Sequence, residues 1–150
     1  MLWRLPPGQP RMPPSRPSRA RPTLSSLALL LLGIAGFVAL WSMLSLSTGL
    51  QHGWMAVLGA LDVVLMLRLG RWPAGPGRVL AALAGTAAVV VASNWLVIAG
   101  QLGRMLGLTP LQSALKLGSH HAWTIAQLAN GTLEIVMAAL ALLVAALASR

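Results

Sequence analysis

The sequence predicts an all-α membrane protein in which four transmembrane helices form an antiparallel bundle, with a short interfacial helix between the third and the fourth. Of its 150 residues, 57% are hydrophobic and 9% are charged, which is too apolar a balance for a water-soluble domain. The hydrophobic residues fall into four runs, separated by short segments that contain glycine, proline or charged side chains. There are no cysteines, so disulfide bonds and thiolate metal sites are excluded.

Residues 1–23 are predicted to form a disordered tail, followed by a single transmembrane domain over residues 24–150. The tail contains seven of the ten prolines, five arginines and no acidic residue. Proline at this density prevents both helix and sheet, so the segment is expected to stay solvated. The functional alternatives to a plain tail are a docking segment and a basic contact with anionic lipid headgroups.

The four spans are expected at about residues 24–47, 51–69, 79–101 and 122–148. A transmembrane helix needs roughly 20 mostly apolar residues, and the first run has no polar side chain from Leu27 to Trp41. An uncleaved signal anchor is favoured there over a cleaved signal peptide, because the apolar run is longer than the usual core of a signal. The segment Arg71–Arg78 holds two prolines and two glycines and is expected to be a turn.

Residues 109–118 are predicted to form the short helix between the third and fourth spans. Thr109 can cap its N-terminus, Pro110 suits its first turn, and Gly118 can end it. This segment is too short to cross a bilayer, so we expect it to lie along the membrane surface.

The basic residues predict that both termini face the cytoplasm. With four spans, one side of the membrane holds nine basic residues, namely the five tail arginines, Arg68, Arg71, Arg78 and Arg150. The other side holds only Arg104 and Lys116. Because positive charge marks the cytoplasmic side, the expected location is a bacterial inner (cytoplasmic) membrane. Topology accounts for the net charge of +9, so no nucleic-acid partner is expected.

The only two acidic residues, Asp62 and Glu134, both fall inside expected spans. An Asp at the centre of a transmembrane helix costs about 2.5–3.5 kcal/mol on the insertion scale, so neither acid is expected to face lipid. Asn94 and Gln101 share one face of the third span, and Gln127 lies on the Glu134 face of the fourth. One hypothesis is an outward-opening cavity in which the two acids bind a proton, cation or small polar ligand, with Asn94 and Gln127 orienting them. The alternative is that these groups hydrogen-bond to one another and hold the bundle in register.

Small residues on the third and fourth spans predict close helix packing. They recur at helical spacing and are Gly85, Ala88, Gly131, Ala138 and Ala141. Such positions let helix backbones approach one another in a membrane. The predicted partners are the lipid bilayer and either another membrane protein or a second copy of this chain.

Three histidines, His52, His120 and His121, are expected near the outer surface and are candidate ligands for a metal or haem. Adjacent histidines on a helix point about 100° apart, and no third histidine follows one turn later. This spacing does not favour a metal site, and no cofactor is expected.

No motif for a phosphate-binding loop, an activated serine or a zinc protease is present, so nothing in the sequence favours an enzyme. A hydrolase that acts through Asp62 and Glu134 is left open. The favoured function is a small accessory or structural subunit of a larger membrane complex. The first alternative is a carrier or sensor that uses the outward-facing cavity. The second is a redox protein that uses the outer histidines.

Overall fold

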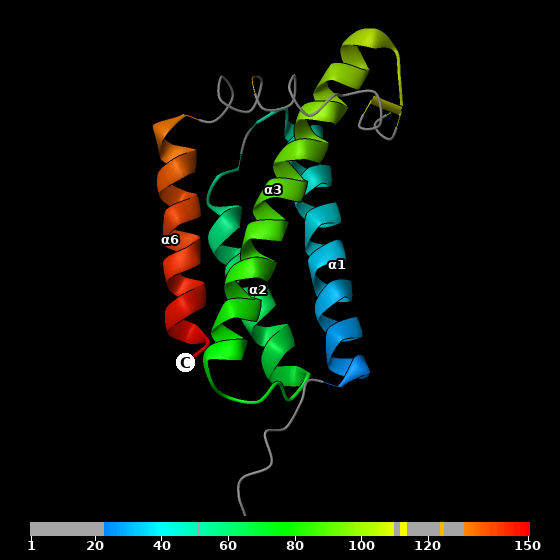
Figure 1. Ribbon diagram of the computed structural model, residues 1–150. Coiled ribbons are helices and arrows are strands. Elements are labelled where there is room, and N and C mark those ends of the chain that lie inside the picture. The colour runs from blue at the N-terminus through cyan, green and yellow to red at the C-terminus, as the bar shows by residue number, and fades with distance from the viewer. Residues whose placement is uncertain (1–22, 51, 110–111, 114–123, 125–130) are drawn as a thin grey trace, which may run out of the picture.

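The computed structural model describes residues 23–50, 52–109, 112–113, 124 and 131–150, and it is helical with no strand in this part of the chain (Figure 1). Its helices are α1 (Leu24–Thr48), α2 (Met55–Leu69), α3 (Pro76–Leu106) and α6 (Thr132–Ala148). The expected all-helical class is therefore confirmed. Residues 1–22 of the expected tail lie outside the described residues.

The helices α2 and α3 form the centre of the described fold. Each contacts the other and also contacts α1 and α6, whereas α1 and α6 do not touch. Successive helices run in opposite directions (Figure 1). α1 and α6 lie on opposite sides of the central pair. One face of α1 and one face of α6 are consequently left without a neighbouring helix among the described elements.

Two helices, α1 and α3, are long and apolar enough to cross a membrane. Their 25 and 31 residues correspond to about 37 and 46 Å at ~1.5 Å per residue, which exceeds the hydrocarbon thickness of roughly 30 Å. The helices α2 and α6, with 15 and 17 residues, measure about 23 and 26 Å. They are shorter than the expected spans.

The ends of the helices follow turn chemistry more closely than hydropathy. α2 begins at Met55 rather than at residue 51, because residues 52–54 form a turn closed by the Met55 amide donating to the His52 carbonyl oxygen (2.9 Å). α3 begins at Pro76 inside the expected turn, because proline suits the first turn of a helix. It ends at Gly107, whose φ of 66° is left-handed and whose amide donates to the Gly103 carbonyl.

The start of the expected interfacial helix is described only in part. Thr109 and Gln112 form a reciprocal cap. The backbone amide of Gln112 donates to Thr109 Oγ1 (3.4 Å), and the backbone amide of Thr109 donates to Gln112 Oε1 (3.3 Å). The Ser113 amide donates to the Thr109 carbonyl (3.0 Å), as in a first helical turn. Residues 114–118 lie outside the described residues, as do 122–123 and 125–130 of the expected fourth span.

The central helices meet at two reciprocal glycine contacts. A Cβ atom on Gly59 of α2 would lie 2.9 Å from Val89 Cγ1, and one on Gly85 of α3 would lie 2.9 Å from Val63 Cγ1. Val63 and Val89 are both 0% exposed. Each valine thus fills the space that the opposite glycine leaves, and the two backbones approach closely.

The other predicted packing residues differ in burial. Ala141 is completely buried, Ala138 is half-buried, and Gly131 is exposed at the N-terminal cap of α6. Ala88 is exposed because it lies on the outer side of α3. It is not buried against any of the described helices, and its contact with another chain stays a prediction.

Two arginines join the central helices to the end of α6. Arg68 of α2 donates to the Ala148 carbonyl (2.8 Å), and Arg78 of α3 donates to the carbonyls of Ser149 (2.6 Å) and Arg150. Carbonyl groups at a helix C-terminus have no partner within the helix and carry partial negative charge. The guanidinium groups supply the missing donors, which fixes the end of α6 beside the connection between α2 and α3.

Candidate functional site

The two acidic residues lie in different places in the fold. Glu134 lines a cavity of about 90 Å³ between the helices, and Asp62 lines a separate groove of about 370 Å³ on the outside of α1 and α2. The structure therefore does not bring the two carboxyl groups together in one cavity, contrary to the expectation from the sequence. Each acid has its own surroundings and its own possible chemistry.

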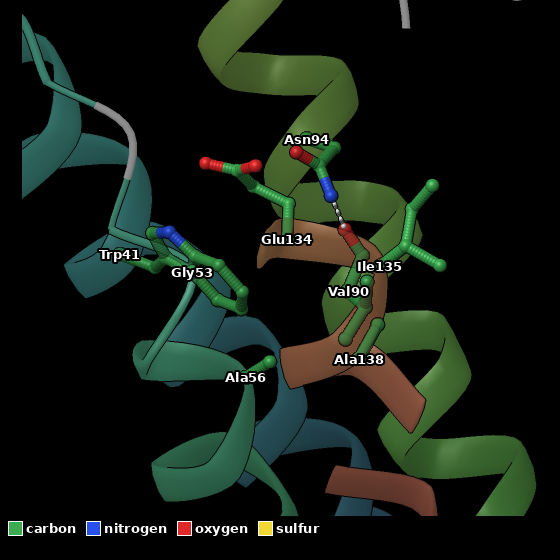
Figure 2. Close-up of a pocket in the computed structure, with 8 residues that line it drawn as sticks. All are labelled: Trp41, Gly53, Ala56, Val90, Asn94, Glu134, Ile135 and Ala138. Atoms are coloured by element: carbon green, nitrogen blue, oxygen red, sulfur yellow. Dashed lines mark hydrogen bonds between the residues drawn. The ribbon is translucent and has the colours of Figure 1, made fainter. Parts of the chain in front are cut away.

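The cavity beside Glu134 is formed by residues from all four helices and from the turn that precedes α2. Its lining residues are Trp41, Gly53, Ala56, Val90, Asn94, Glu134, Ile135 and Ala138 (Figure 2). The Asn94 amide nitrogen donates to the Val90 carbonyl oxygen (3.1 Å), and Figure 2 shows the amide oxygen turned away from that bond. The carboxyl group and this oxygen are both acceptors, so the cavity suits a ligand that carries donors or positive charge.

Glu134 is at the beginning of a helix. It lies in the first turn of α6, three residues after the N-terminal cap Gly131. A carboxylate at this position is stabilised by the partial positive charge of the helix N-terminus. The sequence placed Glu134 well inside a continuous fourth span, whereas the described helix starts only two residues before it.

Two sides of this cavity come into contact at Gly53. A Cβ atom on Gly53 would lie 3.5 Å from both Cα and Cγ of Glu134. The turn before α2 therefore packs directly against the first turn of α6. Trp41, which is 4% exposed, closes the cavity from the α1 side.

Asp62 lies at the midpoint of α2, in a groove that it shares with Met66 and with residues of α1. Its Oδ2 atom is buried and has no hydrogen-bond partner among the described residues. This atom would lie 3.4 Å from a Cβ atom on Gly33 of α1. The carboxyl group is therefore partly covered by the α1 backbone, on the side of α2 that faces away from the Glu134 cavity.

The separation of the two acids follows from helix geometry. Ala56, which lines the Glu134 cavity, and Asp62 are six residues apart, so their side chains point about 120° apart around α2. The contact of Gly59 and Val63 with α3 sets the rotation of α2. Ala56 is thereby directed toward α6, and Asp62 toward α1.

The remaining predicted site residues are not all brought together. Gln101 is half-buried and is not among the residues that line the Asn94 cavity. Gln127 lies outside the described residues, as do His120 and His121. The ring of His52 makes a 3.0 Å hydrogen bond to the Leu50 carbonyl and an edge contact with Trp54. Among the described residues, no three side chains of the metal-binding types form a group.

Sequence reasoning missed four buried hydroxyl groups in the interior of the bundle. Their oxygen atoms have no partner among the described residues, and they belong to Ser42, Ser45, Thr86 and Ser93. Thr86 and Ser93 are seven residues apart, and this spacing places both on one face of α3. That periodicity was the signal available in the sequence. It does not show which helix the face meets.

Comparison with known proteins adds no family assignment. The chain matches no protein-family model, no curated protein and no solved structure.

Proposed function

We propose that this chain is a small multi-pass subunit of a larger membrane complex, with four spans and with both termini on the cytoplasmic side of an inner membrane. Support for the membrane comes from α1 and α3, which are long and apolar enough to cross it. Support for the orientation comes from the arginines, because Arg68 and Arg78 lie at one end of the bundle and Arg104 lies in the last turn of α3 at the other.

The short helix α2 is also compatible with a membrane span. Trp54 lies at its N-terminal cap and Trp72 follows its last residue by three positions. The fifteen residues of α2 itself measure about 23 Å at ~1.5 Å per residue. Tryptophan is enriched at both surfaces of a bilayer. A modest local thinning of the bilayer accommodates a span of this length.

The observation that carries the subunit proposal is the position of Asp62. An acidic side chain at the middle of a transmembrane helix is expected to face the interior of its own bundle. Here it lies in an open groove on the outside, between α1 and α2. A contact with another protein would cover this groove and keep the carboxyl group out of lipid.

The subunit proposal is tested by native mass spectrometry of the tagged full chain, expressed at its natural level and purified in nanodiscs. We expect a complex of fixed stoichiometry with another membrane protein, which persists when the detergent used for extraction is changed. The identified partner should lose assembly or activity when the gene for this chain is deleted. A lone monomer, or a partner that functions normally after the deletion, would contradict the proposal.

A second candidate function is a small-ligand carrier or sensor built on the Glu134 cavity. It is favoured by one observation, which is that Glu134 and Asn94 line the same cavity. A volume of about 90 Å³ limits the ligand to a small cation or a few water molecules. The test is Trp fluorescence titration with sodium, potassium and ammonium ions. Glu134→Gln should abolish a saturable response without lowering expression, and an unchanged response would exclude this function.

A further inference from the structure

The outer groove between α1 and α2 has a length and a shape that can accommodate a helix of another chain. Its α1 wall runs from Leu29 to Leu40, a length of about 17 Å or three helical turns. Two glycines, Gly33 and Gly36, lie within this wall. Met66 of α2 fills the space beside Gly33, whereas a Cβ atom on Gly36 would meet nothing within 4 Å. A neighbouring helix can therefore approach the α1 backbone closely at this point.

The groove holds one unsatisfied polar group. Asp62 Oδ2 is buried and has no hydrogen-bond partner among the residues that the structure describes, whereas the rest of the lining consists of apolar side chains and glycines. An unpaired carboxylate in an apolar environment is strongly unfavourable, and pairing with a cationic donor offsets much of this cost. The occupant of the groove is thus expected to bring a donor to the middle of α2.

This chain does not provide such a donor from its described helices. Asp62 has seven residues of α2 on either side of it. The described cations lie near the ends of the bundle, at Arg68, Arg71, Arg78, Arg104 and Arg150. Through its described residues, a second copy packed in the groove would therefore offer no basic side chain at the depth of Asp62.

We propose that the groove between α1 and α2 docks a transmembrane helix of a different protein, whose Lys or Arg side chain pairs with Asp62. This inference rests on the proposed role as a subunit and specifies the chemistry of the partner. Gly36 of α1 provides the close approach, and the carboxyl group selects a helix with a basic residue near its midpoint. A wholly apolar helix would fit the groove but leave Asp62 unpaired.

The test uses the full chain in vesicles of phosphatidylcholine and phosphatidylglycerol, with a fluorescent donor on Ala74→Cys. The chain has no other cysteine, and Ala74 is exposed in the turn between α2 and α3. The probes are acceptor-labelled poly-leucine helices that carry a single central Lys, Arg or Leu. We expect the Lys and Arg probes to associate at least about tenfold more tightly than the Leu probe, which corresponds to ~1.4 kcal/mol.

Variants of the groove separate the contribution of the Asp62 carboxyl group from that of the open space beside Gly36. Asp62→Asn should remove the preference for the basic probes, and Gly36→Leu should block all probes by filling the groove. Ala35→Leu is the matched control, because Ala35 is exposed on α1 but does not line the groove. Thermal unfolding of each variant verifies that the bundle is intact.

Three outcomes would overturn the inference. They are equal binding of the Lys, Arg and Leu probes, a preference that survives Asp62→Asn, and self-association of the chain that depends on Asp62. If the natural complex forms and is unaffected by Asp62→Asn and Gly36→Leu, the subunit role stands and the groove is not its interface. If the basic probes bind but no natural complex exists, the subunit role is wrong and the groove still prefers a basic helix.

Discussion

At the scale of single residues, glycines that leave room for a larger neighbour determine how closely the helices pack. Gly59 and Gly85 receive valines across the contact between α2 and α3. Gly100 receives Leu46, whose Cδ2 atom would lie 2.6 Å from an added Cβ. The sequence indicated Gly85, because small residues recur around it at helical spacing. It did not indicate Gly59 or Gly100, because their roles depend on which helices meet.

Replacing Gly85 by alanine is expected to destabilise the bundle. The added Cβ would lie 2.9 Å from Val63 Cγ1, and the β-branched Val63 side chain is buried and has little freedom to move. Overpacking of this kind typically lowers the free energy of unfolding by about 1–3 kcal/mol. The measurement is thermal unfolding of the purified protein in a mild detergent.

Gly36→Ala is the matched control for this substitution. It makes the same chemical change in the interior of a helix, but the added Cβ meets nothing within 4 Å. Because alanine has a helix propensity better than glycine by about 1 kcal/mol, this variant should be as stable as the wild type or more stable. Equal stability losses in the two variants would show that the Val63 contact is unimportant.

At the scale of whole elements, the sequence predicted which segments are helical better than it predicted where they end. The hydrophobic runs identified α1, α2, α3 and α6. Hydropathy alone placed the start of α3 at residue 79, whereas proline chemistry places it at Pro76. The position of Glu134 in the first turn of α6 was missed because Gly131 is equally suited to helix packing and to an N-terminal cap.

The arginine contacts at the end of α6 predict that Arg78→Met loosens this helix. Arg78 donates to the carbonyls of Ser149 and Arg150, and a hydrogen bond to a charged group contributes about 1.5–3 kcal/mol where it is shielded from water. Because the bond to Ser149 is only partly buried and the bond to Arg150 is exposed, we expect a loss of about 1 kcal/mol. Hydrogen exchange of residues 141–150, followed by mass spectrometry, should show faster exchange in the variant.

Arg71→Met separates this effect from the loss of a positive charge. Arg71 is an exposed residue in the turn that follows α2, and no hydrogen bond joins its side chain to α6 in the described part of the chain. Its replacement removes the same charge from the same end of the bundle. Exchange in residues 141–150 should remain unchanged, and faster exchange in both variants would indicate a general electrostatic effect.

At the scale of the whole molecule, the candidate site could be predicted only in part. The sequence identified Glu134 and Asn94, and these two residues do line one cavity. It also joined Asp62 to them, because depth along a helix is readable from residue spacing but rotation about the helix axis is not. α2 is apolar apart from Asp62 and from Arg68 in its last turn, so its sequence pattern does not specify which face of the helix turns toward each neighbour. The close contacts of Gly59 and Gly85 with the opposite helix determine the rotation of α2 about its axis.

The orientation of the molecule in the membrane can be measured with single introduced cysteines, because the chain has no cysteine of its own. Leu50 and Ala74 are exposed at opposite ends of α2. If α2 spans with the arginine end in the cytoplasm, Leu50→Cys should react with a membrane-impermeant maleimide in intact spheroplasts. Ala74→Cys should react only after permeabilisation. The reverse pattern would invert the proposed orientation. Labelling of both variants from one side would instead show that α2 does not cross the bilayer.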